Sequence, residues 1–152
     1  MENENIFILI KATVVAAAGA FGAAFGWMGW LTLAWVGCMV LDWISGSAAA
    51  ASKGNWSSSV ARAGAWHKAG MLMVVIVAYV TDNVVSVSVN NMNWLPFDYE
   101  FLVYPVILVW YIFTELGSIA ENAVEMGAPI PAWLPQMLEA GKDIADKLSG
   151  TK

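Results

Sequence analysis

Charged residues are scarce in this chain of 152 residues. They make up 12% of the sequence, where soluble domains carry about 25%, and hydrophobic residues make up 59%, where soluble domains carry about 45 to 50%. A chain this apolar is not expected to fold as a soluble domain, and we interpret it as an integral membrane protein with a single domain. The net charge of −5 and the pI near 4.6 leave no basic patch to neutralise phosphates, which argues against a nucleic-acid partner.

Cysteine and histidine are nearly absent as well. Cys38 is the only cysteine and His67 the only histidine, so the chain has no pair for an internal disulfide and no His/Cys cluster for a metal. The sequence also lacks a P-loop, a dinucleotide-binding fingerprint and the Gly-x-Ser-x-Gly element of hydrolases. We therefore expect no cofactor and no metal, and we predict that the protein is not an enzyme.

The first apolar run covers residues 6–25. It follows acidic residues, where a secretory signal would be basic, so we expect the run to stay in the protein. It is long enough to cross a bilayer, but with Lys11 near one end it is also suited to lie flat on the membrane surface as an amphipathic helix, and both alternatives remain open. Small residues that let helix backbones approach recur along it, which predicts self-association through Ala12, Ala16, Ala20, Ala24, Gly22 and Gly26.

A second apolar run, residues 27–51, carries a single carboxylate, Asp42. An ionised Asp near the centre of a spanning helix costs roughly 2.5 to 3.5 kcal/mol, so its presence requires a reason. The three- and four-residue spacing places Asp42 on one helical face with Trp35, Met39, Gly46 and Ala49. We predict that this seam faces protein or water, and that a very short turn at 26–29 separates the run from the first one.

The segment 52–69 is the longest polar interruption, and it contains basic residues but no acidic one. Short basic loops favour the cytoplasmic side of a membrane, so we place this loop inside, with a short helix near its end. Residues 70–89 form the next predicted span, which carries Asp82, and the acidic segment 90–100 suits the outer face.

The last predicted span covers residues 101–126. Its second half bears a polar stripe at helical spacing, formed by Glu115, Ser118, Asn122 and Glu125. A helix-stop motif follows, formed by Gly127, Pro129 and Pro131. Residues 132–148 then predict an amphipathic helix, packed either on the membrane surface or against its own copies.

These segments predict an all-α integral membrane helical bundle of three to four transmembrane helices plus a C-terminal amphipathic helix. A bundle of three spans and a bundle of four spans both place the C-terminus in the cytoplasm. Asp42, Asp82 and Glu115 lie in three different spans. Either they pair or line watered pathways in the membrane, or they lie near helix ends, where Lys53, Arg62 and Lys68 are available as partners.

Two motifs resemble those of a known family. The stretch Asp42-Trp43-Ile44-Ser45-Gly46 is similar to the Asp-aromatic-Ile-Thr-Gly signature of the toxin-secretion and phage-lysis holins. A longer and more specific stretch resembles the C-terminal signature of that family, Glu115-x-x-Ser118-Ile119-x-Glu121-Asn122-x4-Gly127-x-Pro129-Ile130-Pro131-x2-Leu134-x3-Leu138. Asp82 and the segment 64–68 match the order of the family, and the similarity covers about residues 11–138. The chain departs from the family at His67-Lys68, where two basic residues are usual, and in its Ala-rich first run.

The resemblance implies a multi-pass protein of the bacterial cytoplasmic membrane that oligomerises and opens a pore or lesion. An endolysin, or a secreted toxin or hydrolase, would pass through that opening. The partners would then be the lipid bilayer and further copies of the chain, arranged in a ring. The candidate pore or helix-packing residues are Asp42, Ser45, Gly46, Asp82, Glu115, Ser118 and Asn122. Two alternatives remain: a small ion channel or carrier subunit that uses the intramembrane carboxylates, and a non-conducting holin antagonist.

Overall fold

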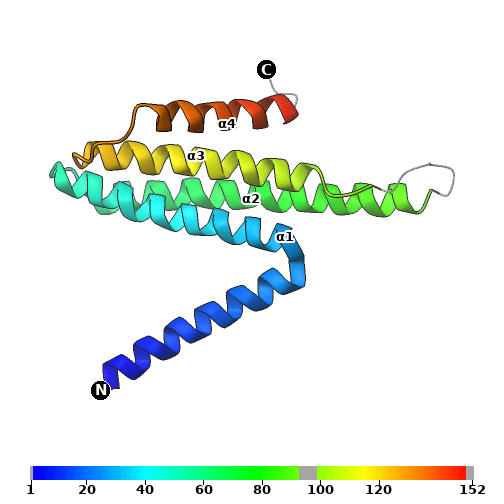
Figure 1. The fold of residues 1–152 in the computed structure, drawn as a ribbon, viewed down its shortest axis with the longest axis horizontal. Helices are drawn as coiled ribbons and strands as arrows, with labels where there is room; N and C mark the ends of the chain where they lie inside the picture. Colours follow the sequence, from blue (N-terminus) through cyan, green and yellow to red (C-terminus); the bar gives the residue numbers. More distant parts are fainter. Residues whose placement is uncertain (1, 93–98, 150–152) are drawn as a thin grey trace. The chain divides into compact units, whose positions relative to one another are not determined.

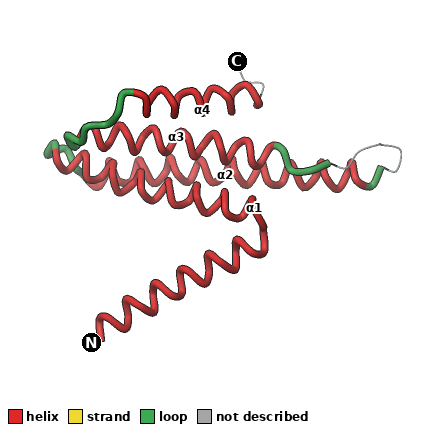
Figure 2. Tube along the Cα trace, viewed as in Figure 1, coloured by secondary structure: helices red, strands yellow, loops and turns green. Residues whose placement is uncertain are grey.

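The computed structural model describes residues 2–92 and 99–149, and this part of the chain contains four α-helices and no strand (Figure 1). The helices are α1 (Glu2–Ser52), α2 (Ser58–Asn90), α3 (Val103–Glu125) and α4 (Trp133–Ser149). Short turns and one longer connection join them (Figure 2). The prediction of an all-α bundle is confirmed. The predicted outer segment 90–100 lies largely outside the described residues.

Helix α1 contains the break that the sequence predicts as a turn. Its 51 residues would extend about 77 Å at 1.5 Å per residue, against a hydrocarbon core of about 30 Å. At Gly26 the backbone leaves helical geometry, with φ of 60° and ψ of −142°, a conformation that a side chain would strain. The break therefore takes a single residue, where we expected a turn of four residues at 26–29. Helical geometry resumes directly after Gly26.

The bend brings one small residue, Gly22, against a large one within the segment Met1–Ala34, which forms a compact unit of its own. A Cβ added to Gly22 would lie 2.6 Å from Cε2 of Trp30. Gly22 and Gly26, predicted as self-association residues, thus lie at an intrachain bend. The four alanines of the same prediction are exposed, and their self-association stays a prediction.

The second compact unit, Trp35–Lys152, contains the end of α1 together with α2, α3 and α4. Its centre is α3, whose backbone approaches those of α2 and α4 and whose side chains reach α1. Trp35 of the predicted α1 seam is 1% exposed and stacks on Tyr111 of α3 at 6.0 Å between ring centroids. Ala49 of the same seam is also 1% exposed. The seam therefore faces protein, as its spacing predicts.

Helix α2 is longer than expected. It begins at Ser58, so the predicted short helix near residues 60–69 and the span 70–89 form one continuous helix. The polar interruption between α1 and α2 shrinks to a tight turn, in which Gly54 has a φ of 69°. Arg62, His67 and Lys68 consequently lie on a helix rather than in a loop.

In the part of the chain that the structure describes, three stretches are long and apolar enough to cross a membrane: Glu4–Ser52, Ala61–Asn90 and Val103–Glu125. Little of each is buried inside the protein, and large apolar side chains point outward along α2, among them Met73, Val77 and Val87, which are 63 to 66% exposed. Such a surface is unfavourable in water and suits hydrocarbon. The two halves of α1 on either side of Gly26 are each long enough to span, so the choice between three and four spans stays a prediction.

Helix α3 ends at Glu125, and Gly127 follows with a φ of 90°. The amide of Gly127 donates to the carbonyl of Val124 and that of Ala128 to the carbonyl of Ala123, which satisfies the last turn. The chain then reverses, and α4 packs along α3 of its own chain. The two positions that the sequence suggested for the amphipathic helix, on the membrane surface or against its own copies, stay predictions.

A glycine makes the contact between α3 and α4 possible. A Cβ on Gly141 would lie 2.4 to 2.6 Å from three ring atoms of Phe113. Leu138, one turn earlier, is 8% exposed, and the ammonium of Lys142 lies 5.4 Å from the centre of the Trp110 ring.

We expect Gly141→Ala to loosen α4 from α3, because the new methyl group displaces the Phe113 ring, at a cost of about 1 to 3 kcal/mol. Hydrogen exchange of the α4 amides in detergent should become faster. The matched control is Gly117→Ala on α3, where an added Cβ has no neighbour within 4 Å. Equal exchange in both variants would contradict the close-packing argument.

Candidate functional site

Three charged side chains from three helices meet inside the bundle. The Nζ of Lys68 on α2 donates to Oδ2 of Asp42 on α1 at 2.7 Å, and also to Oε2 of Glu115 on α3. The Glu115 side chain is 2% exposed, and those of Lys68 and Asp42 are 16% and 17% exposed. One ammonium group thus bridges two carboxylates and ties the three membrane-length helices together. We call Asp42, Lys68 and Glu115 the charged cluster.

A neutral amide completes the cluster. Nδ2 of Asn122, two turns after Glu115, donates to Oδ1 of Asp42 at 3.1 Å and to Oγ of Ser45 at 3.0 Å. The Ser45 hydroxyl in turn donates to the main-chain carbonyl of Asp42 at 3.1 Å. Both hydrogens of the amide are used, and the hydroxyl both donates and accepts, so these groups are held in place rather than poised for chemistry.

The motif residue next to Ser45 also contacts this amide. A Cβ on Gly46 would lie 3.5 Å from Nδ2 of Asn122, an ordinary contact distance, so the main chain at Gly46 runs next to the amide. The Asp42-to-Gly46 motif and the first part of the Glu115-to-Leu138 motif, which are far apart in sequence, thus meet at one point.

A small hollow opens beside the charged cluster. It has a volume of about 290 Å³ and lies between α1, α2 and α3. Its lining includes Asp42 and Lys68 of the cluster together with Ser118 of the polar stripe and Glu121 of the C-terminal motif. Glu125, at the end of that stripe, pairs with Lys53 at 3.1 Å, where both side chains are 47% exposed. A pair this exposed contributes about 0 to 1 kcal/mol.

The third predicted carboxylate lies apart from the cluster and has another task. Asp82 of α2 is fully buried and accepts three hydrogen bonds from the start of α3. The amides of Val103 and Tyr104 donate to it at 3.0 and 2.6 Å, and the Tyr99 hydroxyl donates at 2.6 Å. Leu102, in the N-cap position of α3, makes no side-chain cap. Asp82 therefore caps α3 from a neighbouring helix, where its negative charge also complements the helix dipole.

Tyr99 was not among the predicted residues. Its hydrogen bond to Asp82 is the main reason that its pKa rises to about 12. Its main-chain amide donates to Oδ1 of Asn90 at 2.8 Å, which ties the start of α3 to the end of α2. The only signal in the sequence was the missing local cap at Leu102.

The structure thus divides the candidate residues into two groups. Asp42, Ser45, Gly46, Glu115 and Asn122 lie together around Lys68, and Ser118 lines the hollow beside them. Asp82 lies at the start of α3 instead. Of the three basic partners considered from sequence, Lys68 pairs with Asp42 and Glu115, and Lys53 pairs with Glu125.

We expect Lys68→Met to be strongly destabilising, because it leaves two neighbouring carboxylates without their shared counter-ion. Removing one partner of a buried ion pair costs about 3 to 5 kcal/mol. Unfolding in mixed detergent micelles, followed by circular dichroism, measures the change. The control is Arg62→Met, an exposed cation on the same helix, for which we expect little change.

We expect Asp82→Ala to destabilise the start of α3 by about 1 to 3 kcal/mol, since the donors of Val103, Tyr104 and Tyr99 lose their shared acceptor. The same unfolding measurement, with hydrogen exchange at the start of α3, reports the loss. Thr81→Ala, at the exposed neighbouring position, serves as control. If the two variants were equally stable, Asp82 would not be the cap.

Comparison with known proteins assigns the family. The model of the bacteriophage holin family matches residues 19–143. An uncharacterized protein of Halalkalibacterium halodurans is 30% identical over 131 residues, which cover 86% of this chain and 91% of that relative. An uncharacterized protein of Listeria innocua is 27% identical over 86% of this chain and 85% of its own length. An uncharacterized 14.9 kDa protein in the nagH 3′ region of Clostridium perfringens is 27% identical over 90% and 95%.

No solved structure matches the chain. The family match includes both motifs and the charged cluster, together with most of the three stretches of membrane length. The chain belongs to the bacteriophage holin family, a class of membrane proteins that form pores and are not enzymes.

Proposed function

We propose that the protein acts as a holin: copies of the chain assemble in the cytoplasmic membrane of a bacterium and open a pore or lesion. An endolysin, or a secreted toxin or hydrolase, leaves through this opening. The observation that carries the proposal is the family match over residues 19–143, because members of the family typically oligomerise in the membrane.

The charged cluster supports this function in a specific way. Within one chain, Asp42 and Glu115 already share the ammonium of Lys68, and Asn122 satisfies the second Asp42 oxygen. Charged groups in a membrane are tolerated when they are paired away from lipid. A single copy can therefore insert and accumulate with these three charges paired inside it, and an opening wide enough for a protein requires several copies. This favours a helix-packing role for the cluster residues over a role in the pore wall.

The orientation follows from the charges at the turns. The α1–α2 turn contains Lys53, with Arg62 shortly after it, and the Lys53–Glu125 pair brings the end of α3 to the same end of the bundle. By the bias of basic segments toward the cytoplasm, this end lies inside and the connection between α2 and α3 lies outside.

Controlled expression tests the function. We expect abrupt loss of membrane potential, arrest of growth and release of a co-expressed endolysin, with oligomers captured by crosslinking. Flux that depends on one small substrate, without release of the endolysin, would instead indicate a carrier. Delay of lysis by a separate holin would indicate an antagonist. A chain that stays monomeric and permeabilises nothing contradicts the proposal.

We expect Asp42→Leu to insert normally but to change the time of lysis or the extent of crosslinking. The substitution leaves the Lys68–Glu115 pair neutral and intact, while Asn122 loses its acceptor and α1 loses its ionic contact with α2. The shift in lysis time, read from culture density, is the measurement. Glu4→Leu, which removes an exposed carboxylate outside the cluster, is the control, and an identical lysis time in both would leave Asp42 without a role in assembly.

A further inference from the structure

Helix α4 lies alongside the middle of a membrane-length helix. Gly141 lies against Phe113, and Lys142 lies over Trp110. Both partners are near the midpoint of α3, which spans Val103–Glu125 and is long and apolar enough to cross the bilayer. When α3 crosses the membrane, α4 in this position lies at the depth of the hydrocarbon and not at its surface.

The sequence of α4 is poorly suited to lipid at that depth. One side of the helix packs on α3 through Leu138 and Gly141. The side turned away carries Asp143 and Lys147, and Glu139 is exposed at the edge of the hollow between α3 and α4. Charged side chains at membrane depth occur where they face water or a polar partner.

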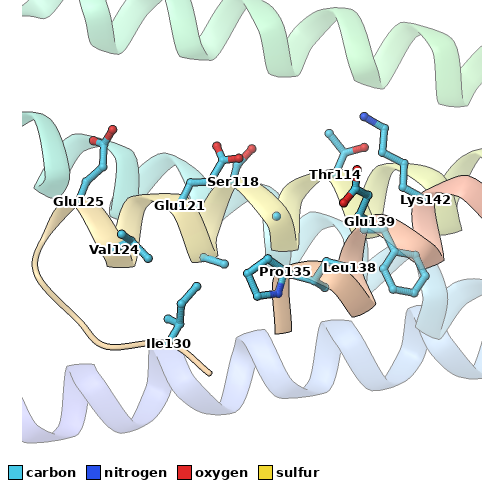
Figure 3. Close-up of a pocket in the computed structure, with 13 residues that line it drawn as sticks. Thr114, Ser118, Glu121, Val124, Glu125, Ile130, Pro135, Leu138, Glu139 and Lys142 are labelled. Atoms are coloured by element: carbon cyan, nitrogen blue, oxygen red, sulfur yellow. The ribbon is translucent and has the colours of Figure 1, made fainter. Parts of the chain in front are cut away.

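A hollow with both apolar and polar lining residues reaches the same depth. It lies between α3 and α4, has a volume of about 760 Å³ and is open to one side. Its lining combines apolar residues of the α3–α4 contact with polar ones, and Figure 3 shows that the polar side chains follow one another along the hollow, from Glu125, Glu121, Ser118 and Thr114 of α3 to Glu139 and Lys142 of α4. The hollow runs from the end of α3, where Glu121 and Glu125 lie, to its middle, where Glu139 and Lys142 of α4 lie, and charged groups inside a membrane protein favour water.

The docked position of α4 is built into the packing. Only glycine at position 141 admits the Phe113 ring, and Leu138 is almost fully buried between the helices. This contact fixes the rotation of α4 about its own axis, so the charged side of α4 keeps one orientation relative to α3. Beside it runs an exposed apolar stripe, formed by Trp133, Met137 and Ile144, which are 51 to 60% exposed.

We propose that α4, docked along α3, lines the water-filled pore of the assembled protein, with its charged side and the hollow facing the lumen. A neighbouring copy covers the apolar stripe, so that the ring closes around the charged sides of several α4 helices. The inference rests on the proposed holin function and adds to it the element that forms the pore wall. The charged cluster lies on the other side of α3, between α1 and α2, and stays within each copy.

Cysteine accessibility tests the pore wall. In a Cys38→Ala background, single cysteines are placed at the edge of the hollow by Glu139→Cys and on the charged side by Asp143→Cys. The control Val77→Cys lies on the exposed apolar side of α2, which we expect to face lipid. Each protein is reconstituted in planar bilayers, and a charged, membrane-impermeant thiol reagent is added to one side at a time. The unsubstituted protein and the Cys38→Ala parent provide the baseline current.

We expect the reagent to lower the current through both α4 variants when it is added from either side, and to leave the current through the Val77 variant unchanged. A conducting parent whose α4 cysteines keep full current, or react from one side only, would overturn the inference and leave the holin function standing. Reaction from one side only would place α4 on the membrane surface. Absence of current in the unsubstituted protein would overturn the holin function and this inference together.

Discussion

The structure depends on the contact of one ammonium group with two carboxylates inside an apolar bundle. Charges in hydrocarbon are unfavourable unless they are paired. A buried ion pair stabilises the fold only when the remaining donor and acceptor atoms of both partners are also hydrogen-bonded. Lys68 provides the counter-ion for Asp42 and Glu115, and Asn122 fills the second oxygen of Asp42. Because the three charges come from α1, α2 and α3, none of these helices can move far without leaving a charge unpaired. The helices have little apolar surface buried between them, so this polar contact has an unusually large part in defining their packing.

The same principle operates at both ends of α3. At its start, the local sequence offers no cap, and Asp82 of α2 supplies one with a fully buried carboxylate. At its end, Gly127 adopts a positive φ and lets the chain fold back as α4. These polar residues therefore serve helix ends and helix contacts, while the outward side of α2 remains apolar. That distribution is expected of a protein whose solvent is lipid, in which unsatisfied backbone groups are far more costly than in water.

Two polar regions lie on opposite sides of α3, and they differ in how far they are satisfied. The charged cluster is closed, with each carboxylate joined to Lys68. The α4 side is open, with charged side chains exposed beside a hollow. Because the charges of the cluster are paired, a single copy is suited to insertion. Because the charges on the α4 side are exposed, a single copy leaves charge uncovered in a bilayer. In the assembly that we propose, copies meet around the α4 side, where charges that are unfavourable next to lipid face a water-filled lumen. The proposal thus assigns helix packing to the charged cluster and the pore wall to the α4 side.

Much of this protein can be inferred from its sequence, because membrane insertion depends on the composition and length of each segment. The apolar runs predicted the helices, the three- and four-residue spacing predicted the buried face of Trp35 and Ala49, and the Gly127 motif predicted where α3 ends. The sequence could not determine which acid meets which base, because residues 42, 68 and 115 become neighbours only when three helices pack. It likewise gave no indication that Asp82 would cap a helix beginning 21 residues later, or that α4 would dock on α3 through Gly141. Residue spacing within a helix shows which side of that helix is polar. Which residues contact that side is decided by tertiary packing, because residues far apart along the chain become neighbours only when the helices pack.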